Sequence, residues 1–76
     1  MAVSAYVLLK LAMGTANDVV AKLNAMDAIA EVSLVYGHHD AIVKVVAEDL
    51  EALKQLIVGL PEQIPHIKDT TTLIQA

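Results

Sequence analysis

Residues 3–11, VSAYVLLKL, predict a β-strand that is apolar on both of its faces. Successive side chains of a strand point to opposite faces, so alternate residues from Val3 to Leu11 share one face, while Tyr6 and Leu8 lie on the other. Residues 41–47, AIVKVVA, repeat the pattern with one charged side chain. The chain has 76 residues, which is enough for one domain, residues 1–76. So short a domain has few helices with which to cover two apolar faces of a sheet.

The other segments alternate between strand and helix patterns. Thr15 and Asp18 resemble a capping box before one apolar helical stripe. A second stripe follows the acidic residues that begin at Glu48, and Gly59 and Pro61 are expected to end or bend that helix. Strands are predicted over four segments: 3–11, 29–36, 41–47 and 66–75.

This order of elements, β-α-β-β-α-β, predicts an α+β, ferredoxin-like sandwich. Right-handed crossovers place both helices on the same face of a four-stranded antiparallel sheet. The other face should then be polar if it meets water, yet residues such as Leu8, Ile42 and Val46 fall on it. We therefore expect a second subunit to cover that face, which gives a dimer formed sheet to sheet.

The composition agrees with a large subunit interface. Apolar residues make up 57% of the chain, against about 45–50% in typical domains. The sequence has no cysteine, no apolar run long enough for a membrane helix and no basic start typical of a signal peptide. We expect a cytoplasmic homo-oligomer with no membrane partner.

The charge excludes one class of partner. The net charge is −4, there is no arginine, and the five lysines are scattered singly. Binding of DNA or RNA requires clustered basic residues. Direct contact with nucleic acid is not expected.

A histidine pair, His38-His39, precedes Asp40 between two predicted strands. Neighbouring strand residues point apart, so these histidines are poor co-ligands for one metal ion, and His66 is distant in sequence. No serine or cysteine nucleophile is close in sequence to serve as their catalytic partner. The segment is predicted to be a turn, with no metal and no cofactor.

Three other features have both a structural and a ligand-binding interpretation. Asp40 either bonds its own backbone in the turn or holds a carboxylate ready for a cation, and the turn interpretation is favoured. Thr70 and Thr72 share a strand face, as good strand residues or as two adjacent hydroxyls for a small polar ligand. Gly37 supplies a positive φ or lets a ligand approach the backbone.

The aromatic and methionine side chains are few. Tyr6 and Tyr36 each either fill core or line a pocket, and the core is favoured for Tyr6. Met13 and Met26 are predicted to be packing residues.

Three segments together resemble the effector-binding (RAM) domain of the Lrp/AsnC family of transcriptional regulators: AYVLLKL, VYGHHDAIVKV and PHIKDTTTLI. Tyr36-Gly37-x-x-Asp40 matches the middle of the family pattern. Asp49-Leu50 matches the start of its second helix, and Thr70-x-Thr72 matches its last strand. The resemblance spans essentially the whole chain and points to a stand-alone form, since the 76 residues begin at the first strand of that domain.

The resemblance implies sheet-to-sheet dimers that associate into rings of eight or ten subunits and bind a free amino acid between dimers. Gly37, His38 and His39 would offer backbone groups to the ligand, and Asp40 would pair with its ammonium group. Thr70 and Thr72 would bond its polar end, and Tyr36 or Leu73 would shape the wall. The histidines occupy variable family positions, and Pro61 departs from the usual second helix.

The leading hypothesis is a non-enzymatic amino-acid sensor that modulates full-length Lrp/AsnC regulators through mixed oligomers. One alternative is a small dimeric α+β-barrel enzyme, such as a cofactor-free monooxygenase or isomerase. The other is an ACT-like regulatory module, which assembles through strand edges. The fold alone does not separate these functions.

Overall fold

The protein forms one four-stranded antiparallel sheet with two helices, and the computed structural model describes residues 2–75. The βαββαβ order predicted from the sequence is confirmed. The elements are β1 (Val3–Leu11), α1 (Ala16–Asn24), β2 (Ile29–Leu34), β3 (Ala41–Ala47), α2 (Leu50–Gln63) and β4 (Ile67–Ile74).

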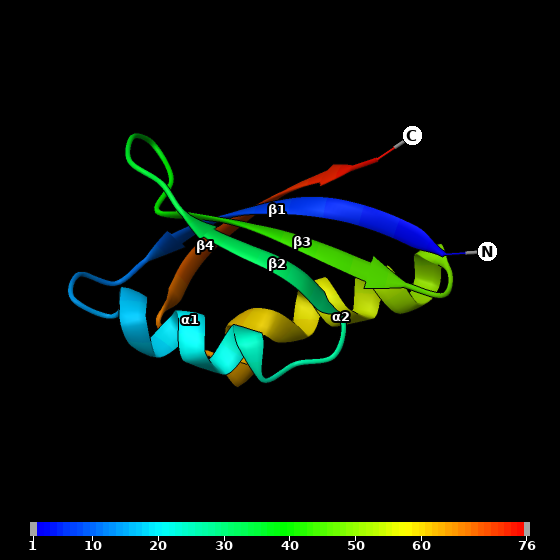
Figure 1. Cartoon of the computed structure of the whole chain (residues 1–76), viewed down its shortest axis with the longest axis horizontal. Coiled ribbons are helices and arrows are strands. Elements are labelled where there is room, and N and C mark those ends of the chain that lie inside the picture. The colour runs from blue at the N-terminus through cyan, green and yellow to red at the C-terminus, as the bar shows by residue number, and fades with distance from the viewer. Residues whose placement is uncertain (1, 76) are drawn as a thin grey trace.

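The strands lie in the order β2-β3-β1-β4, so the two most apolar strands are central and the other two form the edges. Both helices lie on one face of the sheet and leave the other face open (Figure 1). Strands β1 and β3 pair with Val7 opposite Val43, which aligns their alternating apolar residues. The register therefore concentrates apolar side chains at the centre of both faces.

The core lies between the sheet and the helices. Every second residue in the middle of the central strands is buried on this face, and each helix adds buried residues of its apolar stripe. The largest fully buried side chains are Val7, Leu9, Val19, Leu23, Val43, Val45, Leu53, Leu60 and Ile64. The alternation predicted for residues 3–11 and 41–47 thus separates core from open face as expected.

The open face has an apolar centre with charged and hydroxyl neighbours. Tyr6, 37% exposed, lies opposite Lys44, whose Nζ is 5.7 Å from the centre of the Tyr6 ring. Leu8 lies opposite Ile42, and Leu73 of β4 pairs with Tyr6 from the other side. Tyr6 is therefore a residue of the open face rather than of the core.

Helix α1 begins without the capping box that the sequence predicted. Thr15 occupies the N-cap position but makes no side-chain bond to the helix. Its hydroxyl instead donates to the carbonyl of Ala12, at 2.6 Å, within the preceding loop. The prediction is wrong because the loop brings a nearer acceptor to this hydroxyl.

Helix α2 is capped by Asp49, whose carboxylate accepts a hydrogen bond of 2.8 Å from the N–H of Ala52. Of the two outcomes expected for Gly59 and Pro61, an end or a bend of the helix, the end is wrong, because α2 continues to Gln63. Pro61 lies in the last turn of α2, and only two helical residues follow it. The hydrogen bond lost with its missing N–H therefore disturbs little of the helix. Within residues 2–75, no helix is long and apolar enough to cross a membrane.

We expect Leu53→Ala to lower the free energy of unfolding by about 2–5 kcal/mol, since it removes a fully buried side chain and leaves a cavity. The matched control is Leu50→Ala on the same helix, where the leucine is 44% exposed and the loss should be less than about 1 kcal/mol. Urea unfolding at one fixed protein concentration measures both. Equal losses would contradict the described core.

Candidate functional site

The connection between β2 and β3, residues 35–40, projects from the sheet on the side away from the helices (Figure 1). The N–H of Val35 donates to the carbonyl of Asp40, at 3.0 Å, and closes the base of the loop. Gly37 has φ +125°, a conformation that favours glycine, as the sequence predicted. Tyr36 is fully exposed beside it. Strand β2 ends at Leu34, two residues before its predicted end, because the pairing gives way to this loop.

Asp40 ties this loop to β1. Its N–H donates to the carbonyl of Leu9, at 2.8 Å, and its carboxylate Oδ2 accepts from the N–H of Leu11, also at 2.8 Å. The carboxylate therefore continues the ladder past the last β1–β3 pair, Leu9 with Ala41. The favoured interpretation, a bond of Asp40 to its own turn, is wrong, because the strand end of β1 lies within reach of the side chain.

A pocket of about 420 Å³ lies between this loop and the loop that joins β1 to α1. One wall consists of Leu34, Val35, Tyr36 and Asp40. The other wall consists of Leu11, Ala12, Met13, Gly14 and Ala16. The prediction that Met13 packs is wrong, since its side chain is fully exposed at the mouth of this pocket.

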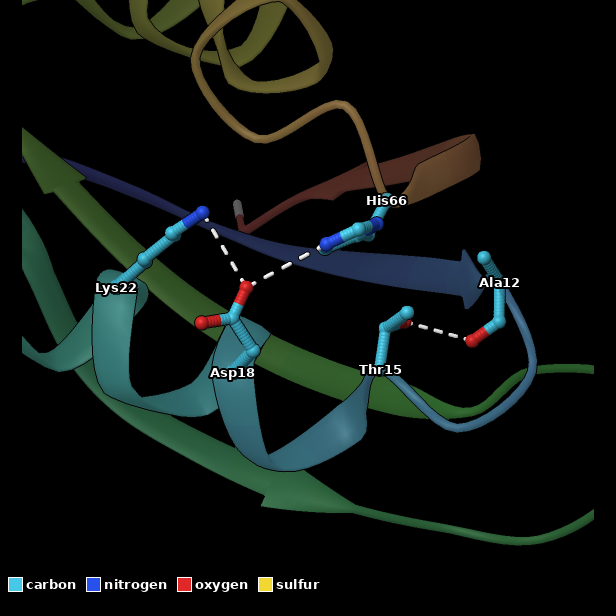
Figure 2. Close-up of polar contacts among 5 residues, drawn as sticks. All are labelled: Ala12, Thr15, Asp18, Lys22 and His66. Carbon is cyan, nitrogen blue, oxygen red and sulfur yellow. Dashed lines mark hydrogen bonds and ion pairs between the residues drawn. The ribbon is translucent and has the colours of Figure 1, made fainter.

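The loop between β1 and α1 is held by hydrogen bonds (Figure 2). The N–H of Ala12 donates to the carbonyl of His66, at 2.8 Å, and the N–H and hydroxyl of Thr15 both donate to the carbonyl of Ala12. Gly14 has φ +79°, which closes the turn. This wall of the pocket is therefore a defined turn fixed to the start of β4.

A small charged cluster joins α1, which carries Asp18 and Lys22, to His66, the residue before β4 (Figure 2). Asp18 Oδ2 is 3.2 Å from Lys22 Nζ and 3.5 Å from His66 Nε2. All three side chains are about half exposed, so these contacts contribute little to stability. His66 lies here, and it does not join the other two histidines.

His38 is exposed and His39 is half-buried, and neither lines the pocket beside Asp40. Within residues 2–75, no three histidine, aspartate or glutamate side chains come close enough together to hold a metal ion. The His38-His39-Asp40 segment is thus a loop that brings one carboxylate, that of Asp40, to the pocket.

Thr70 and Thr72 share a face, as expected, and it is the face toward the helices. They pair with the buried residues Leu9 and Val7 of β1. Because Leu9 also pairs with Ala41, β1 separates Thr70 from the Asp40 end of β3 by two strand spacings, about 10 Å. Thr72 lines a different hollow, of about 290 Å³, between α2 and the edge of β4. Within one chain the threonines and Asp40 do not share a pocket.

Sequence reasoning missed the second wall, which includes Met13 and Gly14, and also the contribution of Leu34. Gly14 was the one available signal, because it marks a turn directly after β1. Nothing in the sequence around Leu34 distinguishes this leucine from a strand residue that packs in the core.

The sandwich of two helices on a sheet with an open face defines an α+β domain of the ferredoxin-like class. The family model of the Lrp/AsnC ligand binding domain matches residues 4–75. The chain belongs to this family.

Two solved structures share the fold over nearly the whole chain. FFRP-DM1 is 38% identical, with a TM-score of 0.92 over 97% of this chain and 99% of that one. A hypothetical protein from Pyrococcus horikoshii is also 38% identical, with a TM-score of 0.89 over 97% of this chain and 89% of that one.

A curated relative is the regulatory protein AsnC of Escherichia coli (strain K12), which is 32% identical over 54 residues. The match covers 71% of this chain and 36% of AsnC. The matched part of the chain thus spans about a third of the length of that regulator.

We expect Asp40→Ala to destabilise the protein by about 0.5–1.5 kcal/mol, because it leaves the N–H of Leu11 without its acceptor. Asp40→Asn keeps an oxygen at the same place and should cost clearly less. Thermal unfolding of the two variants beside the parent protein measures the difference. Equal losses would show that the bond to Leu11 contributes nothing to stability.

Proposed function

We propose that the chain is a non-enzymatic regulatory domain that binds a free amino acid at the Asp40 pocket and works as a homo-oligomer. The observation that carries this proposal is the position of the Asp40 carboxylate, which lines a pocket that is otherwise mostly apolar. Membership of the Lrp/AsnC ligand-binding family supports the same conclusion.

The two oxygens of Asp40 have different surroundings. Oδ2 accepts the bond from Leu11, and within residues 2–75 Oδ1 has no hydrogen-bond partner. An ammonium group in the pocket would use this second oxygen in a charge-assisted bond. The fixed carboxylate is therefore suited to the amino group of an amino acid.

The neighbouring loop offers donors for the ligand's carboxylate. In the described part of the chain, the N–H groups of residues 36–39 have no backbone partner. Consecutive free N–H groups in a turn can bind an anion. Tyr36 would offer its N–H and close the side of the site. Gly37, His38 and His39 lie outside the pocket lining, so their backbone groups would meet only a ligand that extends from the pocket along the loop. Thr70 and Thr72 would reach this ligand only from a neighbouring copy.

The open sheet face supports assembly into a dimer. Tyr6, Leu8, Ile42 and Leu73 form its apolar centre, and no segment within residues 2–75 lies over it (Figure 1). An apolar patch of this kind marks an interaction site. A second copy placed sheet to sheet would bury it, and dimers would join further into rings of eight or ten subunits through the projecting loops.

A ligand bound between dimers favours the assembly that completes its site, so its binding would shift the population of oligomers. Mixed oligomers with full-length Lrp/AsnC regulators would carry this change to transcription in the cytoplasm. The enzyme alternative receives no support, because His38 and His39 do not join Asp40 in its pocket. The ACT-like alternative uses strand edges, whereas the uncovered apolar surface here is a sheet face.

Calorimetry with the twenty amino acids at millimolar concentration tests ligand binding. We expect at least one to bind, and Asp40→Asn to weaken it by about 1.5–3 kcal/mol, because the ammonium loses a charged partner. Asp49→Asn is the matched control, since Asp49 also accepts a backbone N–H but lies at the other end of the sheet. Absence of binding by every amino acid would overturn the sensor proposal.

Light scattering coupled to size-exclusion chromatography tests the assembly. Tyr6→Lys places a second cation beside Lys44 on the open face, so we expect the dimer to dissociate into monomers. Val58→Lys, at a 70% exposed position on α2, is the control and should keep the parent mass. If Tyr6→Lys also keeps that mass, the open face is not the interface.

A further inference from the structure

We propose that the Asp40 pocket selects amino acids with an aliphatic side chain, such as leucine or methionine, over amino acids with polar or charged side chains. This inference rests on the proposed function and adds the class of ligand. It comes from the chemistry of the lining residues and from the exposure of three of them.

The lining has one charged group and one neutral polar side-chain group, the carboxylate of Asp40 and the hydroxyl of Tyr36. Its other side chains are those of leucine, valine, methionine and alanine, and no lysine, arginine, histidine or amide side chain takes part. With Asp40 assigned to the ammonium group, the surface left for the ligand's side chain is apolar. A polar side chain there would give up hydrogen bonds to water without replacement.

Three lining residues expose large apolar surfaces. Met13 and Tyr36 are fully exposed, and Leu34 is 51% exposed. These side chains come from both walls of the pocket, so they offer apolar surface to a ligand from two sides. Burial of such surface against an aliphatic group is favourable in proportion to the area removed from water.

Charge excludes the acidic and the basic amino acids more strongly than polarity excludes the neutral polar ones. Aspartate and glutamate would bring a second carboxylate close to Asp40, where no lining cation offsets the repulsion. Lysine and arginine would place a second cation where the lining has no second acid. The volume of about 420 Å³ is at the small end of ligand pockets, which range over about 300–1,000 Å³, and suits one amino acid.

Calorimetry with a defined set of probes tests this inference on the purified protein. The set is leucine, methionine, asparagine, aspartate and lysine, together with 3-methylbutylamine and 4-methylpentanoate, which are leucine without its carboxylate and without its amino group. We expect leucine and methionine to bind at least about tenfold more tightly than the three polar amino acids. We also expect 3-methylbutylamine to retain measurable binding and 4-methylpentanoate to lose it.

A matched pair of variants places the selection in the pocket. Leu34→Gln changes the wall, so we expect the preference for leucine over asparagine to fall at least about fivefold. Leu50→Gln changes a leucine of similar exposure on α2, outside the pocket, and should keep the parent preference. Circular dichroism of both variants confirms that each one is folded.

The outcomes separate the two proposals. Binding of asparagine or aspartate as tightly as leucine overturns the aliphatic preference and leaves amino-acid binding intact. Absence of binding by every probe, with no binding by the other amino acids, overturns both. A Leu34→Gln variant that changes oligomer mass but keeps the preference for leucine would assign these exposed side chains to a protein contact, which also overturns the inference.

Discussion

Two short helices can cover only one face of a four-stranded sheet, and the rest of this structure depends on that limit. The central strands are apolar on both faces, so folding of one chain satisfies the helix side and leaves the side of Tyr6 and Leu8 uncovered. A domain of this size buries a smaller fraction of its surface on folding than a larger domain does. The uncovered sheet face is therefore a large part of the apolar surface that the chain could still remove from water. The stability of the chain and its proposed assembly therefore both depend on this uncovered face.

The fold could be predicted from the sequence because each of its elements is encoded locally. Alternation in residues 3–11 and 41–47, and helical stripes between the strands, give the order of elements and the face of each side chain. Pro61 shows where local rules fail, since a proline that would break the middle of a helix is tolerated in the last turn of α2.

The site could be predicted only in part. The Gly37–Asp40 segment was visible as a turn with a carboxylate, but its partner, the N–H of Leu11, depends on how β1 ends against β3. Thr15 is a local exception, since its hydroxyl bonds Ala12, three residues earlier in the same loop, instead of the helix that follows. Contacts between segments distant in sequence depend on the tertiary structure, which a local sequence pattern does not predict. The wall that contains Met13 was missed for this reason.

The bond from Leu11 to Asp40 has a consequence for how binding energy is distributed. A free aspartate side chain loses rotational freedom when it captures a cation, and that entropy reduces affinity. Here the backbone of β1 has already fixed the carboxylate before any ligand arrives. The proposed site is preorganised at its charged end. Differences in affinity among related ligands should then arise at the adaptable end, where side chains of the two loops can adjust while Asp40 stays in place.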